Sequence, residues 1–242
     1  MGHILEVRQL NAYYKNNTKS IFARTSKKQV LYDINFDVNE GEILGIVGES
    51  GCGKSTLSKT ILGMNPLYDG KIVHMSKRPQ MIFQDPYSSL NPAWTVGRIL
   101  KEPLILSGVK DKKALDERID DMLVRVGLDA SYARRHPSQL SGGQRQRISI
   151  ATALIARPQL VIADEPLSAL DVTIQAQIME LLLELKEEFG LTYIFISHDI
   201  DVVYQLCDRI IVMKDGHIVE SGETQELFDN PKEPYTRQLI EG

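Results

Sequence analysis

The sequence predicts an α/β fold, in which a mixed sheet is flanked by helices, with an antiparallel β-subdomain at the N-terminus and an inserted α-helical subdomain. Three observations predict it. Residues 43–64 pass from a short apolar run through a glycine-rich loop into a helical pattern, the order in which strand, loop and helix follow one another in α/β proteins. Two further apolar runs, at 160–164 and 192–197, lead into polar residues. Between 95 and 157 the pattern is mostly helical.

Length and composition fit a single domain of this kind. The chain has 242 residues, of which 43% are hydrophobic and 25% charged, as in an ordinary globular protein with a sizeable core. Its 32 acidic and 28 basic residues give a net charge of −4, which argues against nucleic acid as a partner because nucleic-acid-binding surfaces are basic. The sequence has no apolar run of membrane-spanning length and no signal-peptide pattern, so we expect a cytosolic protein.

The N-terminal half begins with predicted strands. Residues 3–14 and 30–38 are strand-like, and in the second segment apolar residues alternate with polar ones, as in half-buried antiparallel strands. The alternating residues are Leu31, Ile34, Phe36 and Val38. The polar stretch between the two segments predicts a hairpin loop. Residues 42–48, "EILGIVG", predict a buried parallel strand, and the helix after the loop places Leu57, Ile61 and Met64 on one face.

The remaining elements follow from helical and strand periodicity. Residues 111–128 carry a buried helical stripe, and a helix over 147–156 is expected to end at Pro158. A helix at 173–190 is expected to end at Gly190, and residues 209–222 predict a hairpin about an Asp-Gly turn. The residues predicted to face inward are Leu115, Ile119, Met122 and Val126 in the first helix, and Ile174, Ile178, Leu181, Leu185 and Phe189 in the later one.

The predicted organisation is one domain over 1–242. Residues 1–94 and 158–242 form the α/β core with its β-subdomain, and 95–157 form the inserted helical subdomain. The two cysteines are not expected to form a disulfide, because Cys52 lies within the glycine-rich loop and Cys207 is its only possible partner.

The glycine-rich loop "GESGCGKST" matches the pattern G-x-x-x-x-G-K-[ST] between a strand and a helix, which is the context of a phosphate-binding loop. Its glycines let the backbone close around phosphate oxygens, Lys54 neutralises the β- and γ-phosphate charge, and the Ser55 hydroxyl ligates Mg²⁺. The sequence therefore predicts binding of a nucleoside triphosphate with Mg²⁺. The predicted nucleotide-binding residues of the loop are Gly48, Glu49, Ser50, Gly51, Cys52, Gly53, Lys54, Ser55 and Thr56.

Two adjacent carboxylates end the apolar run at 160–164. Asp164 stands at the end of a predicted buried strand, where an aspartate of a phosphate-loop nucleotidase holds the Mg²⁺ ion. Glu165 follows it and is expected to polarise a water molecule that attacks the γ-phosphate. These two roles predict hydrolysis of the nucleotide and argue against a phosphate-loop kinase.

A second glycine-containing turn, "LSGGQRQR" at 140–147, opens another helix and suits an anion. Together with the other motifs it resembles the nucleotide-binding subunits of ABC transporters. "LSGGQ" resembles their signature motif, "LVIADEP" their Walker B strand and "SALD" at 168–171 their D-loop. Gln84 in "MIFQDP" resembles the Q-loop glutamine and His198 in "ISHD" the switch histidine.

The resemblance implies that two such domains face each other head to tail, with each ATP between the phosphate loop of one and the signature turn of the other. The residues that it places on the partner's ATP are Ser141, Gly142, Gly143, Gln144 and Asp171. It also implies that Gln84 reaches the metal and the attacking water and that His198 contacts the γ-phosphate. Tyr14 is expected to stack on adenine, with Tyr13 as the alternative.

Residues 84–104, 168–178 and 227–240 resemble ATPases of oligopeptide, dipeptide and nickel importers, whose C-terminal motif is expected here at 223–242. This implies separate integral permease subunits, a solute-binding protein, a place at the cytoplasmic face of the membrane, and a second ATPase, with a heterodimer favoured over a homodimer. The short stretch before Gln84 and the end of the chain soon after "PYTRQLI" favour a shorter nickel or metallophore type. The alternative is a soluble ABC ATPase of DNA repair or translation, but those usually carry coiled-coil insertions or tandem cassettes.

Overall fold

The computed structural model describes residues 2–15 and 27–241. The chain forms two compact units, Met1–Lys77 with Thr192–Gly242, and Arg78–Leu191. They are called the first and the second unit below, and each is described by itself. The hairpin loop predicted between the first two strands falls largely at 16–26, outside the described residues.

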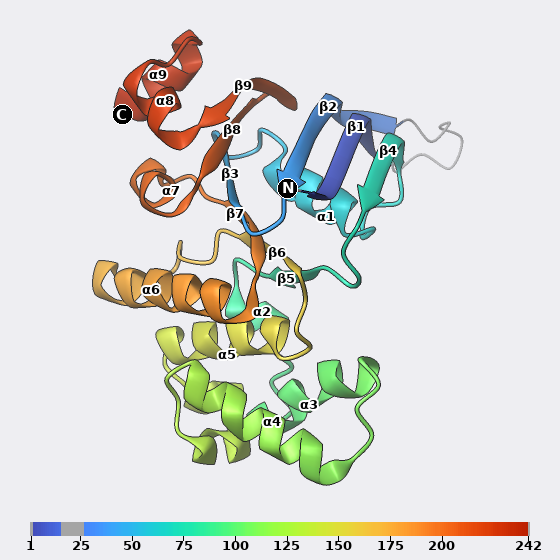
Figure 1. The fold of residues 1–242 in the computed structure, drawn as a ribbon, viewed down its shortest axis with the longest axis vertical. Helices are drawn as coiled ribbons and strands as arrows, with labels where there is room; N and C mark the ends of the chain where they lie inside the picture. The colour runs from blue at the N-terminus through green and yellow to red at the C-terminus, as the bar shows by residue number, and fades with distance from the viewer. Residues whose placement is uncertain (1, 16–26, 242) are drawn as a thin grey trace, which may run out of the picture. The chain divides into compact units, whose positions relative to one another are not determined.

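The first unit contains two groups of paired strands (Figure 1). β1 lies between β2 and β4 and is antiparallel to both. β3 lies between β7 and β8 and is parallel to both, while β9 is antiparallel to β8. The elements are β1 (His3–Lys15), β2 (Lys27–Asn39), β3 (Ile43–Val47), α1 (Lys54–Ile61), β4 (Tyr68–His74), β7 (Thr192–Ile196), α7 (Ile200–Leu206), β8 (Arg209–Lys214), β9 (His217–Glu223), α8 (Thr224–Asp229) and α9 (Pro234–Glu241).

The alternation predicted for the second strand is confirmed. Leu31, Ile34 and Val38 are fully buried and Phe36 is nearly so, while the residues between them are more exposed. β3 is buried along its whole length, as expected for a central parallel strand. The mixed sheet and the N-terminal antiparallel sheet that the sequence predicts are therefore both present.

The helix after the phosphate loop is shorter than predicted. Leu57 and Ile61 are buried as expected, but the prediction for Met64 was wrong, because 57% of its surface is exposed. α1 ends at Ile61, and Gly63 has a φ of 72°. A glycine in this left-handed conformation ends a helix readily, so Met64 lies beyond the last turn.

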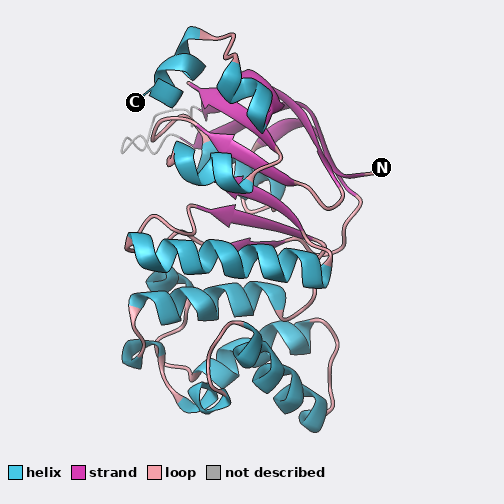
Figure 2. Cartoon of the chain, turned by 60° about the vertical axis from the view of Figure 1, so that its left-hand side comes forward, coloured by secondary structure: helices cyan, strands magenta, loops and turns pink. Residues whose placement is uncertain are grey.

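The second unit pairs β5 with β6 in parallel and is otherwise helical. The long helices α5 and α6 lie side by side in both views (Figures 1 and 2). Its elements are β5 (Gln80–Ile82), α2 (Pro86–Ser89), α3 (Val96–Leu106), α4 (Lys112–Arg125), 3₁₀ turns at Ala130–Arg134 and Pro137–Gln139, α5 (Gly142–Leu154), β6 (Leu160–Asp164) and α6 (Val172–Phe189).

The helical stripe predicted for α4 is confirmed, since Leu115, Ile119, Met122 and Val126 are all buried. In α6 the three central residues of the predicted stripe are buried, whereas Ile174 and Phe189 near its two ends are only half-buried. The prediction that Pro158 ends the preceding helix was wrong, because α5 already ends at Leu154 and Arg157 has a φ of 55°.

The end of α6 and the C-terminal hairpin follow their predictions. Gly190 caps α6 with a φ of 63°. β8 and β9 join through Asp215 and Gly216, with φ values of 48° and 81°, as in a type I′ hairpin turn. Among the helices of the described residues, none has the length and apolar character that crossing a membrane requires.

Glu220 of β9 holds the start of α9. Its carboxylate accepts hydrogen bonds from the backbone N–H groups of Lys232 and Glu233, at 2.9 and 3.1 Å. Burial acts to raise the pKa of Glu220, but the hydrogen bonds that it accepts and the charge of Lys232 outweigh burial and lower the pKa below its ordinary value of 4.5. The charged form is therefore the one that the fold stabilises.

We expect Glu220→Gln to lower the melting temperature at neutral pH. Because the folded-state pKa is depressed, the contribution of Glu220 is present above pH 4.5 and is lost as the pH falls through the folded-state value. The difference between the variant and the wild type should therefore shrink below pH 4.5. Thermal melts across this range test it, with Glu184→Gln on the exposed face of α6 as the control. A difference that stays constant with pH would contradict the assignment.

Candidate functional site

The predicted phosphate loop connects β3 to α1 in the first unit. Gly48, Gly51 and Gly53 have φ values of 147°, 87° and 115°, a range in which only glycine is free of strain. A Cβ atom on Gly48 would lie 2.2 Å from the Met213 carbonyl oxygen, so β8 leaves no room for a side chain there. A Cβ atom on Gly51 would meet nothing within 4 Å. The loop is therefore packed against the sheet on one side and open at Gly51.

Lys54 lies inside this loop. Its side chain is buried, with 5% exposed, and its ammonium group donates hydrogen bonds to the carbonyl oxygens of Gly48 and Glu49, at 2.6 and 3.0 Å. A buried ammonium group needs such partners, because desolvating an unpaired charge is costly. Phosphate oxygens offer the same lysine negatively charged acceptors, with which hydrogen bonds are stronger. The residues of the loop thus fit a phosphate chain.

Cys52 fills space inside the loop. Its sulfur would lie 2.9 Å from a Cβ atom on Gly48, and its carbonyl oxygen accepts a hydrogen bond of 2.9 Å from the N–H of Gly216 in the β8–β9 turn. Burial raises the pKa of the Cys52 thiol, and that of Cys207 as well. Both cysteines are buried free thiols, so the prediction that they do not pair is confirmed.

The strand that leads to His198, β7, is the neighbour of β3, the strand that leads to the phosphate loop. β7 ends two residues before His198, and β7 pairs with β3 so that Ile196 lies opposite Ile46. The two loops therefore leave adjacent parallel strands at the same edge of the sheet, where ligands of α/β proteins bind. His198 itself is exposed, and the next residue, Asp199, caps α7 by accepting hydrogen bonds from Asp201 and Val202.

Gln84 and Glu165, both predicted to be catalytic, meet in the second unit. The side-chain amide of Gln84 donates a hydrogen bond of 2.8 Å to a carboxylate oxygen of Glu165. The two residues follow β5 and β6, which pair with Ile82 opposite Ala163. Two predicted site residues therefore meet at the ends of adjacent parallel strands within this unit. The direct hydrogen bond joins residues 81 positions apart, and the sequence reasoning did not predict it.

The backbone at Glu165 is strained. Asp164, the last residue of β6, is buried with 5% exposed, and Glu165 has a φ of 48°. A residue other than glycine in this region costs about 1–3 kcal/mol, and such residues concentrate at functional sites. The Ser168 hydroxyl and N–H both donate to the Glu165 carbonyl oxygen, at 3.1 and 3.4 Å. The turn thus redirects the chain immediately after Asp164 and is held in that conformation.

The signature turn caps a helix, as predicted. Ser141 is the N-cap of α5, and its hydroxyl accepts a hydrogen bond of 3.3 Å from the N–H of Gln144, whose side chain accepts in turn from the N–H of Ser141. A Cβ atom on Gly143 would lie 2.9 Å from Ile174, whereas one on Gly142 would meet nothing within 4 Å. Packing within the chain thus requires glycine at 143, and the surface beside Gly142 is open.

Asp171 lies close to the signature turn. It is the N-cap of α6 and accepts a hydrogen bond of 3.0 Å from the N–H of Ile174, the residue against which Gly143 packs. The structure therefore brings the predicted signature turn and D-loop together within the second unit. Asp171 and Ser141 are both exposed.

The two tyrosines near the end of β1 differ in their surroundings. Tyr13 has the Lys27 ammonium group 5.7 Å from its ring centroid. Burial and the nearby Asp69 raise the pKa of Tyr13. Tyr14 exposes 41% of its surface. Tyr14 remains the predicted adenine-stacking residue, since its exposed ring is available to a base.

The sequence reasoning missed two further contacts at the predicted site. Arg145, which follows the signature motif, is buried and stacks on the ring of Tyr87 at 3.6 Å, with a hydrogen bond to the Tyr87 hydroxyl. This joins the start of α5 to α2, which follows Gln84. The other missed contact joins Tyr235 of α9 to Glu49 of the phosphate loop. In the sequence, the signals for these contacts were an arginine beside the signature turn and a tyrosine in the C-terminal motif.

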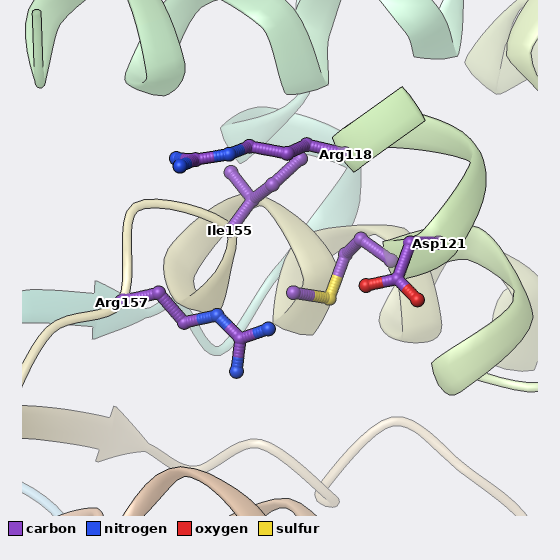
Figure 3. Close-up of a pocket in the computed structure, with 5 residues that line it drawn as sticks. Arg118, Asp121, Ile155 and Arg157 are labelled. Carbon is purple, nitrogen blue, oxygen red and sulfur yellow. The ribbon is translucent and has the colours of Figure 1, made fainter. Parts of the chain in front are cut away.

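A separate cavity of about 150 Å³ lies between α4 and the end of α5 (Figure 3). Arg118, Asp121, Met122, Ile155 and Arg157 line it. The guanidinium groups of Arg118 and Arg157 point in different directions, so they do not converge on one ligand. None of these residues belongs to the predicted site.

The sequence profile described as ABC transporter matches residues 31–168 of this chain. The chain belongs to the ABC transporter family. The oligopeptide transport ATP-binding protein AppF of Bacillus subtilis (strain 168) is 43% identical to it, over 98% of this chain and 77% of AppF. The dipeptide transport ATP-binding protein DppF of Haemophilus influenzae (strain ATCC 51907 / DSM 11121 / KW20 / Rd) is 40% identical, over 96% of this chain and 75% of DppF.

Two solved structures share the fold. CbiO1 of Clostridium perfringens, described as part of the ABC transporter complex cbiONQ, is 29% identical with a TM-score of 0.79, covering 95% of this chain and 92% of its own. The ATP-binding cassette MJ0796, described as a dimer in a post-hydrolysis state bound to ADP and Pi, is 29% identical with a TM-score of 0.79, covering 91% and 98%. The predicted fold class and family are thus confirmed, and the chain is an ATPase of this family.

We expect Glu165→Gln to retain ATP binding and to lower the turnover number by roughly 10²–10⁴-fold, the range for removal of a general base. Glutamine keeps the size of the side chain but cannot accept a proton. Phosphate release under saturating ATP and equilibrium ATP binding measure the two effects. Glu180→Gln on the exposed face of α6 is the control. Turnover at the wild-type rate in Glu165→Gln would remove Glu165 from the role of base.

Proposed function

We propose that this chain is the ATP-hydrolysing subunit of an importer that carries peptides, or another small solute such as nickel or a metallophore, through separate permease subunits. The observation that carries the proposal is the hydrogen bond between Gln84 and the strained Glu165, in a chain that belongs to the ABC transporter family. The names of AppF and DppF, which are transport ATP-binding proteins for oligopeptides and dipeptides, support a peptide as the solute.

In this proposal the phosphate loop and Lys54 bind the ATP phosphates, and Tyr14 stacks on the adenine. Ser55, Gln84 and Asp164 would hold Mg²⁺, since their hydroxyl, amide and carboxylate oxygens are the hard donors that this ion prefers. The ion supplies neutralisation of phosphate charge. Glu165 accepts a proton from the attacking water, and Gln84 orients the Glu165 carboxylate through its hydrogen bond. His198 contacts the γ-phosphate.

We further propose that ATP binds between two such subunits. The open surface beside Gly142 and the exposed Ser141 and Asp171 support a role for this turn toward a second molecule. A ligand shared by two subunits stabilises the closed pair, and its hydrolysis weakens that pair by removing the differential contacts. The partner is a second, related ATPase, with a homodimer as the alternative.

We expect Ser141→Arg, introduced into Glu165→Gln, to abolish ATP-dependent dimer formation while the chain still binds ATP through its own loop. A long cationic side chain would fill the open surface that the partner's nucleotide needs. Sedimentation with and without ATP measures dimerisation, for the chain alone and for its mixture with the second ATPase. Ser131→Arg, at an exposed serine of the same unit, is the control. If the double variant loses ATP binding but still dimerises, sharing of the nucleotide is refuted.

An apolar patch on the second unit supports a contact with the permease. It consists of Trp94, Ile105 and Leu106, of which Ile105 and Leu106 expose 54% and 72% of their surfaces. Together with Arg98, Lys101 and Glu102 these residues line a cavity of about 390 Å³. The Arg98 guanidinium stacks on Trp94 at 4.2 Å. Exposed apolar residues grouped in this way are typical of protein–protein contacts, and the contact would hold the chain at the cytoplasmic face of the membrane.

We expect Leu106→Glu to reduce co-purification of the integral permease subunits with a tagged chain, because a buried unpaired carboxylate is unfavourable in an apolar contact. The membrane fraction is solubilised in mild detergent, and the captured proteins are identified by mass spectrometry. Val124→Glu, at an apolar residue of α4 that is 65% exposed, is the matched control. Capture of ribosomes or DNA in place of permeases would instead favour a soluble ABC ATPase of translation or DNA repair.

A further inference from the structure

The C-terminal helix α9 reaches the phosphate loop through one side chain. Tyr235, the second residue of α9, is buried with 8% exposed. Its hydroxyl oxygen accepts a hydrogen bond of 3.0 Å from the backbone N–H of Glu49, a residue 186 positions earlier in the chain. The region matched by the family profile ends at residue 168, so this contact lies partly outside it.

The peptide group between Gly48 and Glu49 is held at both ends. Its N–H donates to Tyr235, and its carbonyl oxygen accepts the hydrogen bond of 2.6 Å from the Lys54 ammonium group. In a planar trans peptide the N–H and the C=O point in opposite directions. Tyr235 and Lys54 therefore lie on opposite sides of one rigid group, and the orientation that Tyr235 imposes sets where the carbonyl oxygen meets the lysine.

Within the described residues, the other contacts of the loop do not involve the Glu49 N–H. The β8–β9 turn donates the Gly216 N–H to the Cys52 carbonyl oxygen, and Met213 packs against Gly48. These contacts restrain the position of the loop. The Glu49 N–H has Tyr235 as its hydrogen-bond acceptor, so the phenol fixes the rotation of the peptide group.

Tyr235 is itself held in place. The Lys214 ammonium group lies 4.5 Å from the centroid of its ring, and Glu220 accepts hydrogen bonds from the N–H groups of Lys232 and Glu233 just before α9. Burial raises the pKa of Tyr235, so the group beside the loop is a neutral phenol. A neutral acceptor can hold the peptide without repelling the phosphates.

We infer that Tyr235 is a positioning residue of the phosphate loop, whose hydroxyl orients the Gly48–Glu49 peptide and, through it, the Lys54 ammonium group for binding of the phosphates. The inference rests on the proposed phosphate-binding role of the loop. It gives the C-terminal motif a function in nucleotide binding within this chain.

The test is equilibrium binding of ATP and of adenosine to Tyr235→Phe. Phenylalanine keeps the ring and its contact with Lys214 but removes the hydrogen-bond acceptor. We expect the dissociation constant for ATP to rise by roughly three- to tenfold, the range for loss of one hydrogen bond. Adenosine, which lacks phosphates, should bind with unchanged affinity, and the melting temperature without nucleotide should fall by only about 2–4 °C, the shift for loss of one hydrogen bond in a domain of this size.

The matched control is Tyr204→Phe. The Tyr204 hydroxyl donates a hydrogen bond of 3.3 Å to Gln225 in the same unit, so this variant also loses one tyrosine hydroxyl, away from the loop. Hydrogen exchange supplies a second measurement, in which the Glu49 amide should exchange faster in Tyr235→Phe and at the wild-type rate in Tyr204→Phe.

Three outcomes would overturn the inference. Wild-type affinity for ATP in Tyr235→Phe would show that the hydroxyl does not orient the loop. A larger fall in melting temperature with equal losses of ATP and adenosine binding would assign Tyr235 to folding alone. Wild-type ATP affinity in Lys54→Ala would refute the phosphate-binding role itself. In the first case, a strong loss of ATP affinity in Lys54→Ala would leave the proposed function standing and remove only the inference.

Discussion

The buried ammonium group of Lys54 is the constraint on which the rest of the site depends. Only 5% of the Lys54 surface is exposed, and a buried charge must have close hydrogen-bond acceptors. Here the carbonyl oxygens of Gly48 and Glu49 are those acceptors. The loop can turn its carbonyl groups inward because its glycines adopt left-handed conformations. The β8–β9 turn and Tyr235 hold the outer side of the same loop. Segments of the first unit that are distant in the sequence thus meet at the loop that holds this charge.

In the second unit the constraint is the placement of two acidic side chains. Asp164 and Glu165 are adjacent in sequence, and the left-handed backbone at Glu165 separates their surroundings. Gln84 engages Glu165 from the neighbouring strand. The same unit carries the signature turn and the D-loop, which share Ile174 as a packing and hydrogen-bonding partner. A displacement of α6 would therefore change the position of both motifs.

Local patterns in the sequence predicted most of the fold and the residues of the candidate site. Strand alternation, the glycine-rich loop and the parallel strand ends depend on short stretches, so a reader of the sequence can find them. The errors concern helix ends. α1 ends before Gly63, so Met64 lies outside it, and α5 ends at Leu154, before the left-handed residue Arg157. The strain at Glu165 and the bonds Gln84–Glu165 and Tyr235–Glu49 could not be predicted, because they depend on backbone conformation or on tertiary contacts over 81 and 186 positions.

The left-handed conformation of Glu165 (φ of 48°) sets chemical activity against folding stability. Glycine adopts this conformation without strain, whereas other residues lose about 1–3 kcal/mol. Under the role proposed for Glu165, a change to glycine at this position would relieve the backbone strain and stabilise the fold, but it would remove the carboxylate on which hydrolysis depends in that proposal. A strained glutamate at 165 is thus what a site kept for its chemistry would retain.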